Sequence, residues 1–240
     1  LPDKIEQNII LPFNDEEEKL YVANLAEANK ELQELYDLEG SDKMQILKLL
    51  TRLRQLCLEP RLVYDNIDQP SSKLKACMEL IKTMQENKQK VLLFSSFTSV
   101  LDLIAEECQK AGITYYMLTG STNKEDRREL VSRFQKDDTT VFLISLKAGG
   151  TGLNLTSAEA VIHFDPWWNV SAQNQATDRA YRIGQKNNVQ VFNLVMKDSV
   201  EEKIIELQKR KKELADMFVE NNSGGLSQIS KEDILSLFTM

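Results

Sequence analysis

Residues 91–118 read VLLFSSFTSVLDLIAEECQKAGITYYML, and this stretch decides the fold. Its first four residues are a short apolar run, which is typical of a strand buried on both faces. Residues 98–111 then have helical periodicity and stop at Gly112, a residue that commonly ends helices. A second apolar run follows at residues 115–118. A strand, a helix and a strand in this order predict two parallel strands with the helix packed on their sheet.

The same alternation continues on both sides of this unit. It predicts helices over residues 73–86, 122–135 and 171–182, and strands over residues 141–144, 160–164 and 189–195. Thr122 with Glu125, and Ser199 with Glu202, have the spacing of capping boxes at helix starts. We therefore predict an α/β fold, in which a parallel sheet carries helices on both faces.

The two ends of the chain differ from this pattern. Residues 1–12 look extended, and two helices follow, the first ending at Gly40-Ser41 and the second before Pro60. A long helix begins at Ser199, and a short terminal helix comes last. We expect three regions: a helical hairpin in residues 1–70, the α/β region in residues 71–198, and the C-terminal helices in residues 199–240.

Composition excludes several classes of protein. No apolar run approaches the 18 residues that a membrane-spanning helix needs, so we expect no contact with a membrane. Cys57, Cys77 and Cys108 lie far apart in apolar helical patterns, which predicts reduced core thiols in an intracellular protein. The single histidine, His163, falls in a predicted strand, which favours a core role and disfavours zinc chemistry. The chain starts at Leu1 rather than Met, which indicates an excised fragment.

Charge is distributed unevenly along the chain. The net charge is −7, but residues 1–42 hold twelve acidic residues and three lysines, a local charge of −9. Residues 179–212 hold nine Lys and Arg against four acidic residues, a local charge of +5. A local basic strip matters more to a polyanion than the overall sum, although a solvated helix face is the alternative.

Several loops follow the predicted strands and should meet at one edge of the sheet, where such folds bind ligands. Ser145 to Leu155 reads SLKAGGTGLNL, a glycine-rich loop whose backbone N–H groups could converge on an anion, with Lys147 adding charge. A tight turn is the alternative. This loop is not a Walker A sequence, because Gly-x-x-x-x-Gly-Lys-Ser/Thr occurs nowhere in the chain.

Two other loops are rich in small hydroxyl residues. Ser95-Ser96 follows the first strand and Gly120-Ser121 the second, and helix starts of this kind bind phosphates or merely cap the helix. The strand over residues 160–164 is followed by Asp-Pro-Trp-Trp-Asn. There Trp168 could stack on bases or pack beside a sugar-phosphate backbone, and an interface or core anchor is the alternative.

The stretch Gln175 to Gln185 reads QATDRAYRIGQ. If it is helical, Gln175, Arg179 and Arg182 form one stripe. Two adjacent guanidinium groups repel each other, and an anion such as a triphosphate would relieve that repulsion. This stripe therefore suggests a pair of arginine fingers.

Five segments occur in a characteristic order: KVLLFS (90–95), LTGST (118–122), the glycine loop, FDPWWN (164–169) and QATDRAYRIGQ (175–185). In this order they resemble the second RecA-like lobe of Swi/Snf-type DNA translocases, in helicase superfamily two. The resemblance covers essentially the whole chain. Val170 stands where the family usually has proline, and Thr151 replaces its usual Leu or Val. Residues 1–70 are similar to the segment between the lobes and the helical protrusion, and residues 199–218 to the brace helix.

The resemblance implies the following roles. Arg179 and Arg182 are the catalytic arginine fingers, and the ATP-binding residues are Gln175, Asp178, Gly150 and Gly152. Residues on or beside the DNA backbone are Ser95, Ser96, Gly120, Ser121, Lys147, Ala148 and Trp168. ATP and Mg²⁺ would be held mainly by a first lobe that this chain lacks, and no metal ligand is expected here.

The predicted function is therefore the second motor lobe of a DNA-dependent ATPase that translocates on double-stranded DNA, inactive without the N-terminal RecA-like lobe of the same protein. Two alternatives are a non-catalytic protein-interaction module that uses the acidic hairpin, and an RNA helicase lobe. The expected location is the nucleoid-associated cytoplasm in a prokaryote, or the nucleus in a eukaryote.

Overall fold

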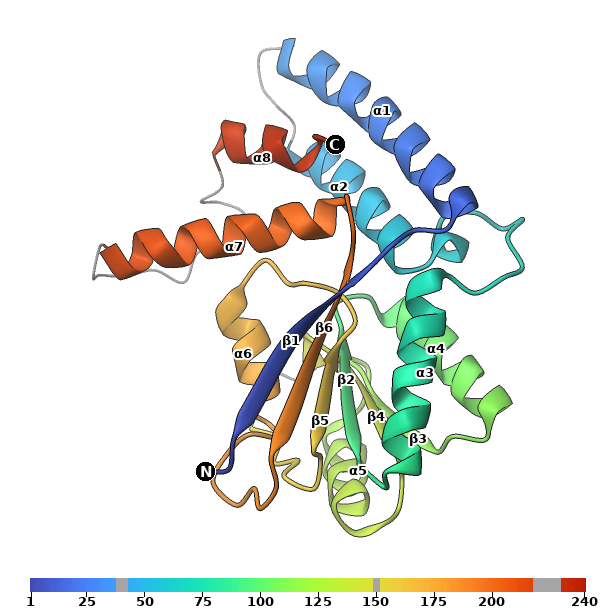
Figure 1. Ribbon diagram of the computed structural model, residues 1–240, viewed down its shortest axis with the longest axis vertical. Helices are drawn as coiled ribbons and strands as arrows, with labels where there is room; N and C mark the ends of the chain where they lie inside the picture. The colour runs from blue at the N-terminus through green and yellow to red at the C-terminus, as the bar shows by residue number, and fades with distance from the viewer. Residues whose placement is uncertain (38–42, 149–151, 218–229) are drawn as a thin grey trace. The chain divides into compact units, whose positions relative to one another are not determined.

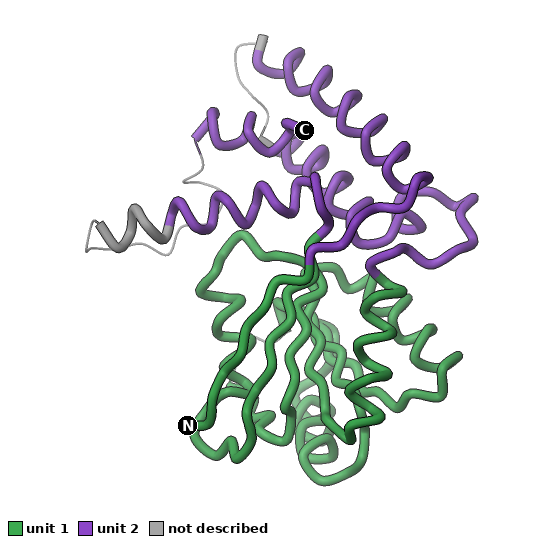
Figure 2. The backbone as a smooth tube through the Cα atoms, in the orientation of Figure 1, with its two compact units in different colours: residues 1–9, 74–195 green, residues 10–73, 196–240 purple. Residues whose placement is uncertain are grey.

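The computed structural model describes residues 1–37, 43–148, 152–217 and 230–240 of the chain. The chain divides into two compact units, which Figure 2 shows in different colours. The first unit contains residues 1–9 and 74–195, and the second contains residues 10–73 and 196–240. The boundaries therefore differ from those expected from sequence, because the first nine residues join the sheet unit and both helical ends join a single second unit.

The first unit is built on a parallel sheet, as predicted. In the described residues the sheet has six strands in the order β1-β6-β5-β2-β4-β3 (Figure 1). They are β1 (Lys4–Leu11), β2 (Val91–Ser95), β3 (Tyr115–Leu118), β4 (Val141–Ser145), β5 (Ala160–His163) and β6 (Val189–Met196). The central strand β2 pairs in parallel with β4 on one side and with β5 on the other. Strands β4 and β3 lie on one side of β2, and β5, β6 and β1 lie on the other. The strand order therefore reverses beside β2, and ligands bind at such a switch point in folds of this type.

Strand β1 was expected only as an extended segment. It lies beside β6 at the edge of the sheet, where the Val189 N–H donates to the Asp3 carbonyl at 3.0 Å. The Asn193 side chain also donates to Glu6 and Asn8 on β1, at 3.0 Å each. Most β1 residues are exposed. No alternating buried pattern therefore identifies this segment as a strand, and its long-range pairing decides its structure.

Helices cover both faces of the sheet (Figure 1). They are α3 (Ser72–Glu86), α4 (Thr98–Ala111), α5 (Lys124–Lys136) and α6 (Val170–Thr177). One buried cluster joins Phe134 of α5 and Ala176 of α6 to Leu92, Phe142 and Val161 of the sheet. This packing confirms the α/β architecture and fixes the helices whose ends surround the candidate site.

Two predicted helix starts are wrong in detail. Asn123, not Thr122, caps α5, and its side chain accepts the Asp126 N–H at 2.9 Å. The Thr122 hydroxyl instead accepts the Thr119 N–H at 3.1 Å, which stabilises the preceding turn. At the start of α7 (Val200–Met217), Glu202 accepts the Asp198 N–H rather than that of Ser199. At α5 the capping residue is therefore one position later than predicted. At α7 the Ser199 hydroxyl does accept a backbone N–H at the helix start, that of Glu201 at 3.1 Å, and only the Glu202 bond is displaced by one residue.

The second unit consists of helices. It contains α1 (Asp15–Asp37), α2 (Lys43–Leu58), the short 3₁₀ helix η1 (Pro60–Leu62), α7 and α8 (Lys231–Leu237). The predicted stop at Gly40-Ser41 lies outside the described residues. The Tyr21 hydroxyl accepts the Val200 N–H at 2.7 Å, and the Asn29 amide donates to the Phe238 carbonyl at 2.7 Å. These bonds join the predicted hairpin directly to the C-terminal helices.

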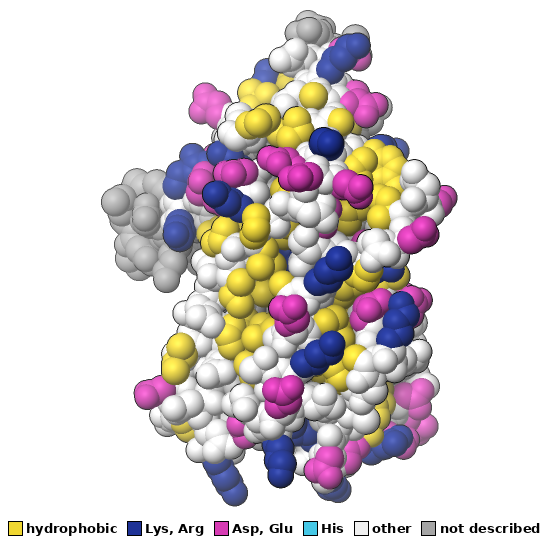
Figure 3. Space-filling model, turned by 45° about the vertical axis from the view of Figure 1, so that its right-hand side comes forward, with side chains coloured by type: hydrophobic (Ala, Val, Ile, Leu, Met, Phe, Trp, Pro, Cys, Tyr) yellow, Lys and Arg dark blue, Asp and Glu magenta, His cyan; other side chains and the backbone are white. Residues whose placement is uncertain are grey.

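The three cysteines are buried core residues, as composition predicts. Cys57, Cys77 and Cys108 are buried and none forms a disulfide, and burial raises the pKa of the Cys108 thiol to about 12. No described helix combines the length and the apolar character of a membrane span. On the face shown in Figure 3, acidic and basic side chains are interspersed.

Candidate functional site

The loops after β2, β4 and β5 meet at the carboxyl edge of the sheet, as the parallel arrangement requires. The Leu146 N–H donates to the Ser95 carbonyl at 3.0 Å, and the Phe164 N–H donates to the Phe94 carbonyl at 2.9 Å. These bonds extend the pairing just past the strands. Segments more than fifty residues apart in sequence therefore form one continuous edge.

Asp165 organises the centre of this edge. Its side chain is 1% exposed and accepts the Ser95 hydroxyl at 2.7 Å and the Ser96 N–H at 3.1 Å. The Ser96 hydroxyl also donates to the Asp165 carboxylate. Sequence reasoning missed this role, although an acidic residue directly after a buried strand is a usable signal. Ser95 is fully buried, so its hydroxyl supports the loop from inside and does not face solvent, contrary to the expected contact with a phosphate.

The other residues expected beside DNA differ in how exposed they are to solvent. Gly120, Ser121 and Lys147 are exposed, and Trp168 is half-buried. Ala148 is only 2% exposed, and its N–H donates to the Ser145 hydroxyl at 3.3 Å. Its side chain therefore packs into the core and does not face the loop surface. Gly150 lies outside the described residues, whereas Gly152 has a positive φ of 51°, a conformation that favours glycine.

The predicted arginine stripe is not a single helix. Helix α6 ends at Thr177, so only Gln175 lies on it, and Arg179 and Arg182 lie in the turns that follow. The Leu155 N–H donates to the Arg179 carbonyl at 3.0 Å, and the Arg182 Nη1 donates to the Leu153 carbonyl at 3.3 Å. Short-range turns and bonds to residues 153–155 therefore hold this part of the chain, in place of the continued helix that local periodicity predicts.

Gln185 holds these turns in place, and sequence reasoning did not assign it this role. It is 7% exposed, and its amide nitrogen donates to the carbonyls of Ala158 at 2.8 Å and Ala180 at 3.1 Å. Its amide oxygen accepts the N–H groups of Lys186 at 2.9 Å and Asn187 at 3.0 Å. The side chain thus satisfies backbone groups of its own turn and the carbonyl of the distant Ala158.

The two arginines are close enough to affect each other. Burial and then the neighbouring Arg182 guanidinium lower the pKa of Arg179, while Asp178 opposes this shift. Among the described residues, the buried Arg179 Nε has no hydrogen-bond partner. Gln175, Asp178 and Arg182 are exposed beside it. A repelling guanidinium pair with an unsatisfied donor fits an anionic ligand such as a phosphate.

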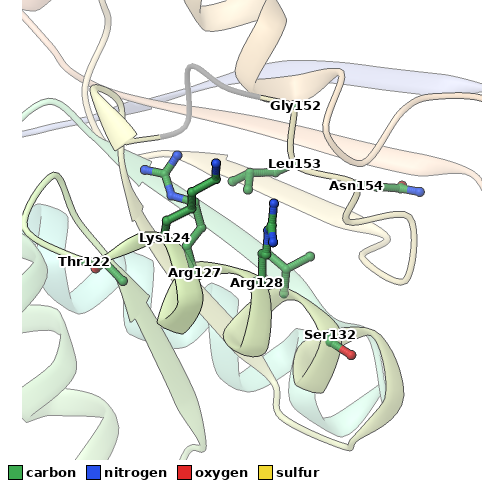
Figure 4. A pocket seen from close by; sticks show the side chains of 9 residues that line it. Thr122, Lys124, Arg127, Arg128, Ser132, Gly152, Leu153 and Asn154 are labelled. Carbon is green, nitrogen blue, oxygen red and sulfur yellow. The ribbon is translucent and has the colours of Figure 1, made fainter.

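A basic cleft of about 690 Å³ lies between helix α5 and residues 152–154. Helix α5 contributes Lys124, Arg127 and Arg128, whose side chains extend toward the chain at Gly152 and Leu153 in Figure 4. The segment 152–154 therefore lines the cleft and, through the Leu153 carbonyl, also contacts Arg182. Sequence reasoning missed these three residues, although their i, i+3, i+4 spacing places them on one helix face.

His163 is a core residue, as predicted. It is 2% exposed, stacks on Phe94 with ring centroids 5.7 Å apart, and its Nε2 lies 2.9 Å from the Thr177 hydroxyl. Burial lowers the pKa of His163 to about 4, although Asp165 opposes this shift. The described residues contain no cluster of three or more His, Cys, Asp or Glu side chains that could bind a metal.

Comparison with known proteins is consistent with this geometry. A model of the helicase conserved C-terminal domain matches residues 72–184. A Mycoplasma pneumoniae protein named "Uncharacterized ATP-dependent helicase" is 37% identical over 99% of this chain and 23% of its own length. The ISWI chromatin-remodeling complex ATPase ISW1 of Saccharomyces cerevisiae is 34% identical over 99% of this chain and 22% of its own length. The chain therefore spans about a quarter of these relatives.

A solved structure extends the comparison to the fold. The Sulfolobus solfataricus SWI2/SNF2 ATPase core in complex with double-stranded DNA has a TM-score of 0.79 and 30% sequence identity to this chain. The match covers 99% of this chain and 50% of that core. The sequence matches and the shared fold lead to one conclusion: the chain belongs to the Swi/Snf-type family of helicase superfamily two, as its C-terminal RecA-like lobe.

Proposed function

We propose that this lobe works in an ATP-dependent translocase on double-stranded DNA, in which Arg179 and Arg182 act as arginine fingers. The observation that carries the proposal is the guanidinium pair itself. Arg179 is half-buried with its Nε unsatisfied, and Arg182 is exposed beside it. Such a pair would neutralise charge on a transferring phosphoryl group, which is worth about a thousandfold or more in rate.

The nucleotide would be held mainly by a first lobe, which the other half of the matched ATPase core would supply. ATP supplies the phosphoryl group that is transferred to water, and Mg²⁺ would be bound by that first lobe together with the phosphates. In this lobe, Arg182 is held by the Leu153 carbonyl, and Gln175 and Asp178 border the pair. The chain alone is proposed to hydrolyse no ATP, because it has no Walker A sequence.

The DNA backbone would run along the same edge of the sheet. Exposed Gly120, Ser121 and Lys147 and half-buried Ser96 and Trp168 border that edge, and the α5 cleft adds three positive charges. Contacts with phosphates rather than base edges imply binding that is independent of sequence and sensitive to salt. The relative solved with double-stranded DNA supports this partner.

The test is the Arg182→Ala variant of the full-length protein. We expect DNA-stimulated ATP hydrolysis to fall about a thousandfold, while the Kd for duplex DNA stays within a few fold, because the finger acts on the nucleotide. Steady-state hydrolysis with and without DNA measures the first quantity, and fluorescence anisotropy measures the second.

A matched control is Arg133→Ala, which removes an exposed arginine that faces Glu129 at 3.7 Å. This variant should hydrolyse ATP at the wild-type rate. Wild-type turnover in Arg182→Ala would disprove the finger role. Stimulation by RNA but not by duplex DNA would instead favour an RNA helicase.

A further inference from the structure

Ile183 occupies an unusual position directly beside the proposed finger Arg182. It is 90% exposed, more than any other large hydrophobic side chain in the described residues, including the terminal Leu1 at 71% and Met240 at 83%. Scattered exposed apolar residues are ordinary on protein surfaces. The feature that distinguishes Ile183 is the rigid turn that presents it.

Ile183 lies at the apex of a β-turn. The Gln185 N–H donates to the Arg182 carbonyl at 2.9 Å, which closes a four-residue turn. Gly184, at the third position, has a positive φ of 107°, as a type II turn requires. Proline is the residue favoured at the second position of such a turn, and here isoleucine occupies it. An isoleucine there gains nothing from the fold of this lobe.

The turn is also fixed from both ends. On one side, Arg182 donates to the Leu153 carbonyl at 3.3 Å. On the other, Gln185 is 7% exposed and bonds to the Ala158 and Ala180 carbonyls. The backbone that carries Ile183 is therefore held in place, so little backbone entropy remains to be lost when a partner covers the side chain.

We propose that Ile183 is a docking residue that inserts into an apolar recess on the first motor lobe when the two lobes close. The inference rests on the proposed function. If Arg182 reaches a nucleotide held by the first lobe, the next residue of the same rigid turn must approach that lobe as well. The matched ATPase core is about twice the length of this chain, so it provides a partner surface that this chain lacks. Ile183 is thus a positioning residue that acts through Arg182.

The experiment uses the full-length protein with three substitutions. Ile183→Ser should lower kcat for DNA-stimulated ATP hydrolysis about tenfold, because the apolar contact that favours closure is lost. The Kd for duplex DNA should not change. Ile183→Val, which keeps an apolar branched side chain, should restore most of the rate. The matched control is Ile5→Ser, at an isoleucine that is 53% exposed on edge strand β1, and it should behave as wild type.

A second measurement locates the partner without depending on turnover. A photoreactive amino acid is placed at position 183, and the protein is irradiated with duplex DNA and a non-hydrolysable ATP analogue. Crosslinks to the first lobe, increased by the analogue, support docking. Crosslinks only to DNA or to this lobe, or wild-type kcat in Ile183→Ser, would overturn it. A failure of the fingers would show instead as full activity in Arg182→Ala, with the crosslinks unaffected.

Discussion

At the scale of single residues, His163 shows how burial determines chemistry. It lies against Phe94 and beside the Thr177 hydroxyl, and burial lowers its pKa to about 4 in the folded protein. The unfolded chain has a pKa near the usual value of about 6.5. The folded state therefore binds fewer protons than the unfolded state between these two values. The contribution of neutral His163 to the free energy of unfolding is fully present above pH 6.5 and is lost as the pH falls toward 4.

This difference predicts a measurable pH dependence. Between pH 7 and pH 5, His163 should reduce the free energy of unfolding by about 2 kcal/mol. Urea unfolding of the chain at both values measures this loss in the wild type and in His163→Asn, which cannot gain a proton in this range. Carboxylates titrate in both proteins, so their contribution cancels in the comparison. Equal losses in the two proteins would show that His163 does not titrate as described.

At the scale of elements, helix α5 combines two functions on different faces. Phe134 packs in the core, while Lys124, Arg127 and Arg128 line the basic cleft. If the cleft binds DNA phosphates, each cation there displaces about one counterion on binding. We expect Arg128→Ala in the full-length protein to reduce the slope of log K against log salt concentration by about one. Anisotropy titrations with duplex DNA at several salt concentrations measure this slope.

The same helix provides the control for this prediction. Arg133 does not line the cleft, and its guanidinium lies 5.2 Å from the Tyr116 ring centroid. Arg133→Ala should therefore leave the salt slope unchanged. If both variants reduce the slope equally, the attraction comes from the general charge of the helix rather than from phosphates in the cleft.

At the scale of the whole molecule, a buried ion pair joins segments 128 residues apart. The Lys73 Nζ donates to the two Glu201 carboxylate oxygens at 2.7 and 2.8 Å, and the two side chains are 0% and 1% exposed. Glu201 also accepts the Met196 N–H at 2.8 Å. The pair thus holds the start of α3 to the start of α7 within the second unit.

Removing one member of the pair should be costly. Lys73→Met leaves an uncompensated buried carboxylate and should lower the free energy of unfolding by about 3–5 kcal/mol. The double variant Lys73→Met, Glu201→Gln removes both charges and keeps an acceptor for the Met196 N–H, so it should recover most of this loss. Urea unfolding of the four proteins in a double-mutant cycle tests the coupling. Additive losses would show that the two residues act independently.

Much of the architecture was accessible from the sequence because its signals are local. Strands β2 and β4, buried on both faces, are continuous apolar runs, and Gly112, with a φ of 67°, ends α4 as its position predicts. Residue type and spacing also drew attention to the glycine loop and to the two arginines, whose roles stay predictions. For these features, the neighbouring residues in the chain carry enough information.

The remaining features depend on contacts between distant segments. The pairing of β1 beside β6, the inward hydroxyl of Ser95 on Asp165, and the end of α6 before Arg179 are all set by partners far away in the chain. By itself, then, the sequence determined which elements form and which loops carry charge, because apolar periodicity and turn residues act locally. Only the tertiary structure decided which side chains face the site, because a hydrogen bond from a distant segment can override the local preference of the backbone.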